Sequence, residues 1–554
     1  MLAAVRRHWF WGLLAAYLLY ALAFVFQSSM IVDGRRYFLL LDDPMISMTY
    51  ARNLARGYGA VWYPGAEPVQ GYSNPLWMLY MAMVHWLPLP PSLMSLPIQL
   101  TGIALIGGMM FCVKVLTEAL ARESPAGRGS SADAVSTTAA PPCLAPFLAV
   151  LLSGFYFPLN NWTLRGMEVG LLALGTSLAV WAALRCRSGS RWQGWLLPLL
   201  GLLTTVRMDA VVVGAAVLLW LTWAVPERRW RTLTVGLAWL MLFVIGQMVI
   251  QRIYYHDWLP NTYYLKVAGV PLERRLLWGV YVLFQFLVGM GLWVLAPAAF
   301  HVVTARGRDV WLLLAVIAAQ TGYSVYVGGD AWEHWGGANR YLSVVLPLFF
   351  VLVALGLVTL AAWVAKAVPT VEPSKTLAVF VVGLLILVRV NSYQSGADKS
   401  LDQWLLRTPP PELAWNFEKI RQALWVRQVT SPRARVAVIW AGTIPYFSQR
   451  PMIDMLGKND RVIAQGPNRP YSPPPLEFFR ATTVPYCWPG HTKYNFRYAV
   501  GKLAPDVIIE FWPGMEAVQE ILQRDYDFLR FGKTFIFLKK NSTELKRGVA
   551  PTPS

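Results

Sequence analysis

Long apolar stretches alternate with short polar ones along most of this chain. Twelve stretches are rich in Leu, Val, Ala and aromatic residues, and most approach the roughly 20 residues that a helix needs to cross a bilayer. They cover residues 8–27, 75–90, 93–119, 143–159, 166–184, 193–206, 209–225, 232–253, 276–304, 309–327, 341–365 and 376–391. The pattern predicts a mainly α-helical protein, built as a polytopic bundle of transmembrane helices.

The polar stretches between them fall into two classes. Short basic stretches are typical of cytoplasmic loops, and they lie at residues 185–191, 227–231, 306–308 and 366–375. The other stretches then face outward, namely loops 28–74, 160–165, 254–275 and 328–340 and everything after about residue 392. A cytoplasmic start and an external end require an odd number of spans. We therefore expect eleven or thirteen spans and prefer eleven, with one of the runs that meet at Pro88-Leu89-Pro90-Pro91 re-entrant or interfacial.

Hydrophobicity drops near residue 392, which predicts a boundary between two domains. Residues 1–391 would form the transmembrane domain, with a first external loop at 28–74, and residues 392–554 a small external α/β domain. Short β-branched runs bounded by turn residues predict strands, and other segments there predict helices. The strands are expected at 435–440, 505–510 and 534–539, and the helices at 411–428 and 515–524.

Composition supports a membrane protein. The chain is 56% hydrophobic and 14% charged, whereas soluble proteins carry roughly 25% charged residues. The net charge of +19 follows from the basic cytoplasmic loops, and no nucleic-acid-binding motif accompanies it, so we expect the lipid bilayer as a partner and no nucleic acid. The four Cys are too far apart in sequence to indicate a metal knuckle or redox pair.

Two adjacent acids follow the first apolar stretch. Asp42 and Asp43 precede Pro44, which suits the first turn of a helix, and apolar residues recur at helical spacing after it. Asp43 would then be the N-cap, and that role alone is one interpretation of it. Capping needs only one carboxylate. A pair of acids can also deprotonate an acceptor hydroxyl, or hold a metal beside a phosphate.

The residues around this pair resemble a known family. Residues 42–77, DDPMISMTYARNLARGYGAVWYPGAEPVQGYSNPLW, resemble the first external loop of GT-C-fold glycosyltransferases. The likeness is closest to bacterial relatives of the mycobacterial terminal β-(1→2)-arabinofuranosyltransferase. Further matching motifs follow in order along the chain: Arg165-Gly166-Met167-Glu168-Val169, Arg207-Met208-Asp209 with Met in place of Pro, Leu259–Lys266, Gly328-Gly329-Asp330, Arg340-Tyr341-Leu342, Ala441-Gly442, Asp454–Gly457 and Pro489–Lys493.

The resemblance implies an enzyme of the GT-C type. It would move a monosaccharide, arabinofuranose in the narrower group, from a polyprenyl-phosphate donor to an envelope glycan, lipoglycan or pilin-like acceptor. The enzyme would lie in the inner (cytoplasmic) membrane, with its active site and C-terminal domain facing the periplasm. No cofactor and no resident metal are expected. A divalent metal has one candidate group, His334 with Asp330 and Glu333, although carboxylates this exposed are usually only solvated.

The resemblance also implies roles for single residues. The catalytic candidates are Asp42 and Asp43, of which we favour Asp42 because Asp43 can serve as the cap. Lys266 and Arg340 are the first candidates to bind the donor phosphate, followed by Arg207 and His491. Residues expected to contact substrate are Glu168, Tyr72, Asn74, Trp77, Tyr263, Asp330 and Lys493.

Each role has a structural alternative. Lys266 and Arg340 can anchor the chain at the membrane surface, and Arg207 with Asp209 can form a structural ion pair. The aromatic residues, including Trp332 and Trp335, suit an interfacial belt. For the whole chain, the alternatives are a transporter or flippase of lipid-linked sugars and a non-catalytic assembly partner. The absence of a sequence repeat disfavours the transporter, and the intact acid pair disfavours the partner.

Overall fold

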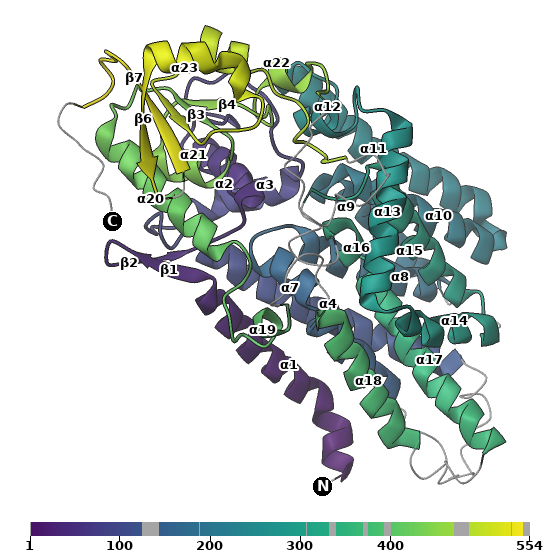
Figure 1. The fold of residues 1–554 in the computed structure, drawn as a ribbon. Coiled ribbons are helices and arrows are strands. Elements are labelled where there is room, and N and C mark those ends of the chain that lie inside the picture. Colours follow the sequence, from purple (N-terminus) through teal and green to yellow (C-terminus); the bar gives the residue numbers. More distant parts are fainter. Residues whose placement is uncertain are drawn as a thin grey trace. The chain divides into compact units, whose positions relative to one another are not determined.

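The structure is a computed structural model (Figure 1) and describes residues 2–123, 143–187, 189–305, 307–331, 339–368, 375–392, 400–469, 487–532 and 534–546. Glu333, His334, Trp332 and Trp335 lie outside these residues. The chain divides into two compact units. Unit 1 comprises Met1–Gln27, Gln99–Ile245 and Gly279–Pro411, and unit 2 comprises Ser28–Ile98, Gly246–Trp278 and Glu412–Ser554.

Unit 1 consists of helices. Its described helices are α1 (Leu2–Gln27), α4 (Leu96–Glu123), α6 (Leu144–Gly154), α7 (Phe157–Leu164), α8 (Val169–Cys186), α9 (Gln193–Val206), α10 (Val211–Ala224), α11 (Arg229–Tyr255), α13 (Leu272–Met290), α14 (Leu295–Thr304), α15 (Asp309–Tyr326), α16 (Arg340–Ser343), α17 (Leu346–Ala367), α18 (Lys375–Ser392) and α19 (Ser400–Trp404), with short 3₁₀ turns between some of them. Helices α4, α11 and α13 have most of their residues in this unit and extend into unit 2. The predicted mainly helical fold is confirmed.

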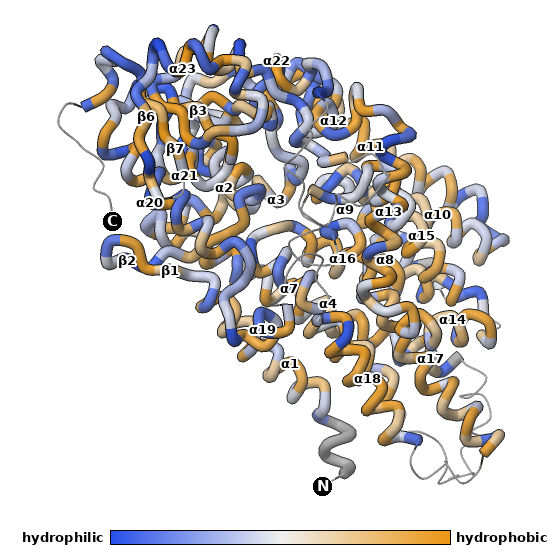
Figure 2. The backbone as a smooth tube through the Cα atoms, in the orientation of Figure 1, coloured by the Kyte–Doolittle hydropathy of each residue, from blue (hydrophilic) through white to orange (hydrophobic). Residues whose placement is uncertain are grey.

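All but one of the predicted apolar stretches lie on these helices, and the exception, 75–90, lies in unit 2. α9 has the predicted bounds, and α17 and α18 are orange along most of their length in Figure 2. The segment expected as an outer loop at 160–165 is helical up to Leu164, the end of α7, and its side of the membrane stays a prediction. In α11, only 11% of the most apolar window is buried, as expected for a helix that faces lipid.

Length and composition select six of the described helices as candidate spans, or eight if two bent pairs each count as one. The bent pairs are α6 with α7, at 50°, and α13 with the segment ending at Thr304, at 82°. The shorter apolar helices include α9 and α3 (Pro75–Val84), and the latter has 10 residues. Ten residues rise only about 15 Å, so α3 cannot cross a bilayer, in line with the expectation of one non-spanning run near residue 88. The total of about eleven stays a prediction.

Close packing in unit 1 depends on a glycine of α17. A Cβ atom added at Gly356 would lie 1.9 Å from the carbonyl oxygen of Pro297 in α14. One atom of this contact is a backbone oxygen and the other is a Cβ atom bonded directly to the backbone. Rotation of a side chain therefore cannot relieve the clash. Small residues allow such close helix contacts in membranes.

We therefore expect Gly356→Val to lower the thermal stability of the protein in detergent by several degrees, because α14 and α17 must separate. Scanning fluorimetry of the purified protein measures the change in Tm. Gly12→Val is the matched control, since nothing lies within 4 Å of a Cβ atom at that residue. An unchanged Tm for Gly356→Val would contradict the packing described here.

Unit 2 contains a sheet and short helices. Its elements are β1 (Ser29–Val32), β2 (Arg35–Phe38), α2 (Asp42–Ala55), α3, α12 (Asn261–Lys266), α20 (Leu413–Val429), β3 (Val436–Val438), α21 (Thr443–Ser448), β4 (Met452–Asp454), α22 (Arg461–Ala464), a π-helix (Arg497–Lys502), β5 (Val507–Ile509), α23 (Gln519–Asp525), β6 (Tyr526–Phe531) and β7 (Thr534–Lys539). The sequence predicted three of these strands, β3, β5 and β7, and two of these helices, α20 and α23, close to their observed positions.

The larger sheet has five strands in the order β4-β3-β5-β7-β6. β3 pairs in parallel with β4 and β5, whereas β7 pairs antiparallel with β5 and β6. All residues of β3, β4 and β5 are buried, as is typical of parallel strands covered on both faces. The small α/β domain is confirmed near the C-terminus, although β4 and β6 were not predicted. The proposed boundary at residue 392 stays a prediction.

Candidate active site around Asp42 and Asp43

Helix α2 of unit 2 begins at the acid pair. Asp42 and Asp43 both lie in its first turn, and the residue at the N-cap position is Leu41, whose side chain makes no capping hydrogen bond. The predicted N-cap role of Asp43 and the first helical position predicted for Pro44 are therefore wrong. The negative charges still interact favourably with the positive end of the helix dipole, and both carboxylates are directed to other partners.

Asp42 is held by the segment that follows strand β3. Its side chain accepts hydrogen bonds from the backbone N–H groups of Thr443 at 2.9 Å and Gly442 at 3.2 Å. A Cβ atom at residue 442 would lie 1.9 Å from the carbonyl oxygen of Asp42, so only glycine allows this approach. Asp42 is 2% exposed, so its carboxylate is enclosed by these protein groups.

A buried lysine completes the surroundings of Asp42. The Nζ atom of Lys419, in α20, lies 3.3 Å from Oδ1 of Asp42. It also lies 2.9 Å from the ring centre of Trp415 and 4.6 Å from that of Trp440, so aromatic faces stabilise the cation. Burial lowers the pKa of Lys419 to about 8, although the carboxylate of Asp42 opposes the shift. Nearby, burial raises the pKa of Glu510 to about 7.

Asp43 is the more accessible of the two acids. Its side chain is 21% exposed, and its Oδ1 atom lies 2.9 Å from Nζ of Lys458. Burial lowers the pKa of Lys458, but the carboxylate of Asp43 outweighs this effect and the pKa lies above its usual value. Asp43 is thus the carboxylate of the pair that combines solvent access with an adjacent cation.

The loop after β4 places Lys458. The carboxylate of Asp454 accepts hydrogen bonds from the backbone N–H groups of Leu456, Gly457 and Asn459, at 3.0, 3.0 and 2.8 Å. Asp454 is 1% exposed, and burial raises its pKa to about 6 despite these bonds. These hydrogen bonds shape the loop. The Asp454–Gly457 motif thereby positions the next residue, Lys458, which sequence reasoning missed.

His491 lies beside this group. Its ring stacks on Trp488, with ring centres 4.3 Å apart and planes 16° apart. Burial lowers the pKa of His491 to about 3, and the positive charges of Lys458 and Lys266 add to the shift. The imidazole is consequently neutral near pH 7, where it can donate a hydrogen bond but carries no charge, and its role toward the donor phosphate stays a prediction.

The two predicted lysines of unit 2 differ in their surroundings. Lys493 is 2% exposed, and its Nζ atom donates to the carbonyl oxygens of Tyr264 and Ala464, both at 2.8 Å. It therefore ties α12 to α22. Lys266 is half-buried beside Gly490, and within the described part of the chain its ammonium has no carboxylate within 4.0 Å. Lys266 is the better placed of the two to meet an anion.

The predicted substrate contacts of the first loop are mostly packed inside unit 2. The hydroxyl groups of Tyr72 and Tyr255 lie 2.8 Å apart, and Asn74 Oδ1 accepts from Ser47 Oγ at 2.8 Å. Tyr72, Asn74 and Trp77 are all at most 6% exposed. Their visible role is to hold the loop, whereas Tyr263 is 37% exposed.

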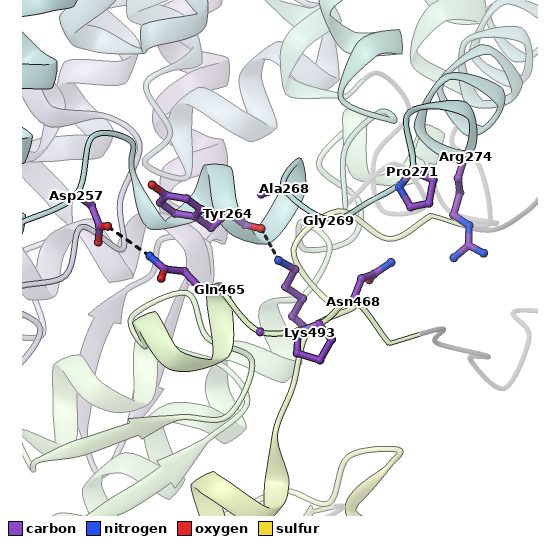
Figure 3. Close-up of a pocket in the computed structure, with 11 residues that line it drawn as sticks. Asp257, Tyr264, Ala268, Gly269, Pro271, Arg274, Gln465, Asn468 and Lys493 are labelled. Carbon is purple, nitrogen blue, oxygen red and sulfur yellow. Dashed lines mark hydrogen bonds between the residues drawn. The ribbon is translucent and has the colours of Figure 1, made fainter.

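An open cleft of about 860 Å³ lies next to Lys493 (Figure 3). Its volume falls within the range of small-molecule sites. Figure 3 shows Lys493 and Tyr264 joined by a hydrogen bond, with Asn468 and Arg274 to one side and Asp257 to the other. The lining residues are Asp257, Tyr264, Ala268, Gly269, Pro271, Arg274, Gln465, Gly466, Pro467, Asn468 and Lys493.

The other predicted site residues belong to unit 1, where they form ion pairs. Arg207 donates to both oxygens of Asp209, at 2.8 and 3.2 Å, and to Glu168 at 3.1 Å. Arg340 donates to both oxygens of Asp330, each at 2.8 Å. Paired carboxylates compensate both guanidinium groups, which agrees with the structural alternative for Arg207 and Asp209.

Comparisons with known proteins bear on the fold. Residues 412–543 match a family described as "Domain of unknown function (DUF8728)". ArnT from Cupriavidus metallidurans, solved in the apo state and bound to undecaprenyl phosphate, aligns at 13% and 12% identity with TM-scores of 0.54 and 0.55. These alignments cover 95% and 96% of this chain and 97% of each ArnT chain.

An oligosaccharyltransferase from Archaeoglobus fulgidus aligns over 91% of this chain and 69% of its own, at 11% identity and a TM-score of 0.54. This chain has the GT-C fold. No curated protein sequence matches it. The GT-C fold expected from the motifs is thus confirmed, while the arabinofuranosyltransferase relationship is not.

Within this GT-C fold, sequence reasoning missed Lys419, Lys458, Trp415 and Trp440. Lys458 directly follows the matched Asp454–Gly457 motif, which was the available signal. Lys419 is in a mixed polar and apolar helix, where nothing in the local pattern marks one lysine as buried. Among the described residues, no group of three or more His, Cys, Asp or Glu side chains has the arrangement of a metal site.

Proposed function

We propose that this protein is a membrane glycosyltransferase that transfers a monosaccharide from a polyprenyl-phosphate donor. The observation that carries the proposal is the acid pair on a GT-C fold, in which Asp42 is locked and Asp43 is partly exposed beside Lys458. A protein of the same fold was solved with undecaprenyl phosphate bound, which supports a donor of this lipid class.

In the proposed reaction, Asp43 accepts the proton of the acceptor hydroxyl group. The acceptor oxygen then forms a bond to the anomeric carbon of the sugar, and the bond from that carbon to the phosphate oxygen breaks. Polyprenyl phosphate leaves with the electron pair of that bond. Lys266 and Lys458 are the unit 2 cations suited to stabilise the departing phosphate, and Asp43 later releases its proton to water.

Asp42 is assigned a positioning role in this scheme. Its bonds to Lys419, Gly442 and Thr443 fasten the start of α2 to the C-terminal sheet. Because Asp43 is the next residue, the same bonds define where its carboxylate lies. The assignment of the reacting group thus moves from Asp42 to Asp43.

The cleft beside Lys493 is the proposed acceptor site. It offers amide, carboxylate and guanidinium groups from Asn468, Asp257 and Arg274, which suit the hydroxyl groups of a glycan. The sequence resemblance favours arabinofuranose as the sugar, and an envelope glycan, lipoglycan or pilin-like protein as the acceptor. The reaction would take place on the external face of the cytoplasmic membrane.

The experiment that tests the function is incubation of the purified full-length protein with a panel of polyprenyl-phosphate sugars and candidate acceptors. Release of polyprenyl phosphate together with a glycosylated acceptor is the expected result. The alternative, a flippase of lipid-linked sugars, would move the donor across proteoliposomes without releasing polyprenyl phosphate. That outcome in the absence of transfer would overturn the proposal.

The rate of transfer is expected to fall as the pH rises above about 8. Lys419 is charged below its pKa of about 8 and neutral above it, so at higher pH Asp42 loses the cation opposite it. Lys419→Arg should move this alkaline limb to higher pH, because a guanidinium group stays charged. The measurement is a rate profile between about pH 6 and 10. An identical limb in wild type and Lys419→Arg would rule out Lys419 as its source.

A further inference from the structure

A second group of cations lies at the opposite end of α2. Arg52 is in the last turn of the helix and Arg56 is its C-cap residue, and ten residues separate Arg52 from Asp42. At 1.5 Å per residue, this separation is about 15 Å along the helix axis. The two arginines therefore do not belong to the carboxylate site.

These arginines line a small, partly enclosed pocket of about 150 Å³. None of its nine described lining residues is acidic: they are Arg52, Arg56, His85, Leu87, Leu89, Pro91, Met94, Tyr446 and Gln449. The volume is below the roughly 300 Å³ at which sites for whole small molecules begin. It suits a single compact group such as a phosphate.

Arg52 is buried without a counter-charge. It is 5% exposed, its guanidinium donates to the carbonyl oxygen of Tyr446, and its Nε atom has no hydrogen-bond partner. Within the described residues, no carboxylate lies within 4.0 Å of Arg52 or Arg56. Burial lowers the pKa of Arg52 to about 10, which is still well above neutral pH. The guanidinium also lies 4.9 Å from the ring centre of Tyr446. Because buried charges are normally paired, this arrangement favours binding of an anion.

The neighbouring groups add donors around the same space. Arg56 is exposed, and its Nη1 atom lies 3.5 Å from Oε1 of Gln449. His85 Nδ1 lies 2.7 Å from the carbonyl oxygen of Met81, and Nε2 lies 3.0 Å from the hydroxyl of Tyr446. Burial lowers the pKa of His85 to about 4, so the imidazole is neutral and the two arginines supply the charge.

An apolar surface borders this pocket. Along α3 and the turn after it, Leu79, Met83, Trp86 and Leu87 are 47%, 53%, 71% and 45% exposed. Leu79 and Met83 are four residues apart and therefore lie on one face of α3, whereas Trp86 and Leu87 lie in the turn after its last residue, Val84. A short helix with exposed apolar residues, followed by a turn that exposes Trp, is typical of a segment that lies in the membrane interface.

We propose that Arg52 and Arg56 bind the phosphate of an anionic lipid headgroup, at a site distinct from the reacting carboxylates, while the apolar surface of α3 and the turn after it contacts the bilayer. Leu87 belongs both to this surface and to the lining of the pocket. A phosphate bound between the arginines would therefore lie at the level of the headgroups. The site would anchor the C-terminal end of α2 to the membrane surface.

The test measures lipid binding to the purified full-length protein by native mass spectrometry. The probes are phosphatidylglycerol and phosphatidylcholine, with inorganic phosphate as a competitor. Wild type should bind phosphatidylglycerol in preference to phosphatidylcholine, and Arg56→Gln should weaken that binding about tenfold, as loss of one charge-assisted hydrogen bond predicts. Trp86→Ser should weaken it as well.

Arg56 is the residue to replace because it is exposed, whereas substitution of Arg52 would also remove its bond to Tyr446. Arg433→Gln is the control, since Arg433 is exposed and outside the pocket lining. Equal binding by Arg56→Gln and Arg433→Gln would overturn the proposal, as would equal binding of the two lipids. Displacement of the lipid by millimolar inorganic phosphate would overturn the assignment to a lipid. Asp43→Asn should bind phosphatidylglycerol normally, so this result is separable from the proposed transfer activity.

Discussion

Replacement of Asp43 by Asn is expected to slow sugar transfer about 10²- to 10⁴-fold, the range that a positioned general base contributes. Asn has nearly the same shape as Asp but cannot accept the acceptor proton. The substitution also removes the charge opposite Lys458, whose side chain is only 11% exposed, so a moderate fall in Tm is expected, smaller than for a fully buried ion pair. The loss of transfer should appear in kcat, measured as polyprenyl phosphate released per enzyme at a temperature where the variant is still folded.

Two further variants make this result specific. Asp527→Asn is the matched control, because the side chain of Asp527 is 76% exposed and it lies in the same unit. Asp42→Asn should lower both Tm and activity, since it removes the partner of Lys419. If Asp43→Asn were fully active and Asp42→Asn were inactive with an unchanged Tm, then Asp42 would be the reacting acid. Full activity of both variants would exclude the mechanism.

The second large effect is expected from Lys419→Met, which should destabilise the protein by about 3–5 kcal/mol. Methionine fills a similar volume between Trp415 and Trp440, so the main change is that the buried carboxylate of Asp42 loses its cation. By the usual relation between stability and Tm for domains of this size, Tm should fall by about 6 °C or more.

The double variant Asp42→Asn/Lys419→Met distinguishes charge from packing. If charge is responsible, removal of both charges should restore much of the lost Tm, because no ion is then left buried without its partner. Lys502→Met is the control for replacement of an exposed lysine. A double variant as unstable as the sum of the two single variants would show that Asp42 and Lys419 contribute independently.

Much of the fold follows from local sequence patterns. Runs of apolar residues determine where helices such as α9 and α17 lie, because in lipid the backbone must form its hydrogen bonds within each segment. β7 could also be predicted from a local pattern, because it is a run of six residues with strand propensity between turn residues. β4 was missed because its three residues include one β-branched residue, whereas the equally short β3 and β5 have two and three. α7 was missed because it is a short helix that follows a bend.

The candidate site could be predicted only in part. The sequence located the acid pair, because two acids in a sparsely charged chain and the motifs after them are visible without coordinates. It also placed Lys266 and Arg340 among the candidate cations. The tertiary structure shows that their surroundings differ. Arg340 is paired with Asp330, whereas Lys266 has no carboxylate within 4.0 Å among the described residues.

By itself, therefore, the sequence determined that this is a membrane protein with a GT-C-like pattern of loops and an acid pair after its first helix. Only the tertiary structure decided which acid is buried and which is accessible. The backbone of Gly442 and Thr443 and the side chain of Lys419 lie about 380–400 residues beyond Asp42, and no local pattern encodes such a contact. Accessibility and charge pairing depend on these distant partners, and in the proposed reaction they are the reason why Asp43 rather than Asp42 is given the reacting role.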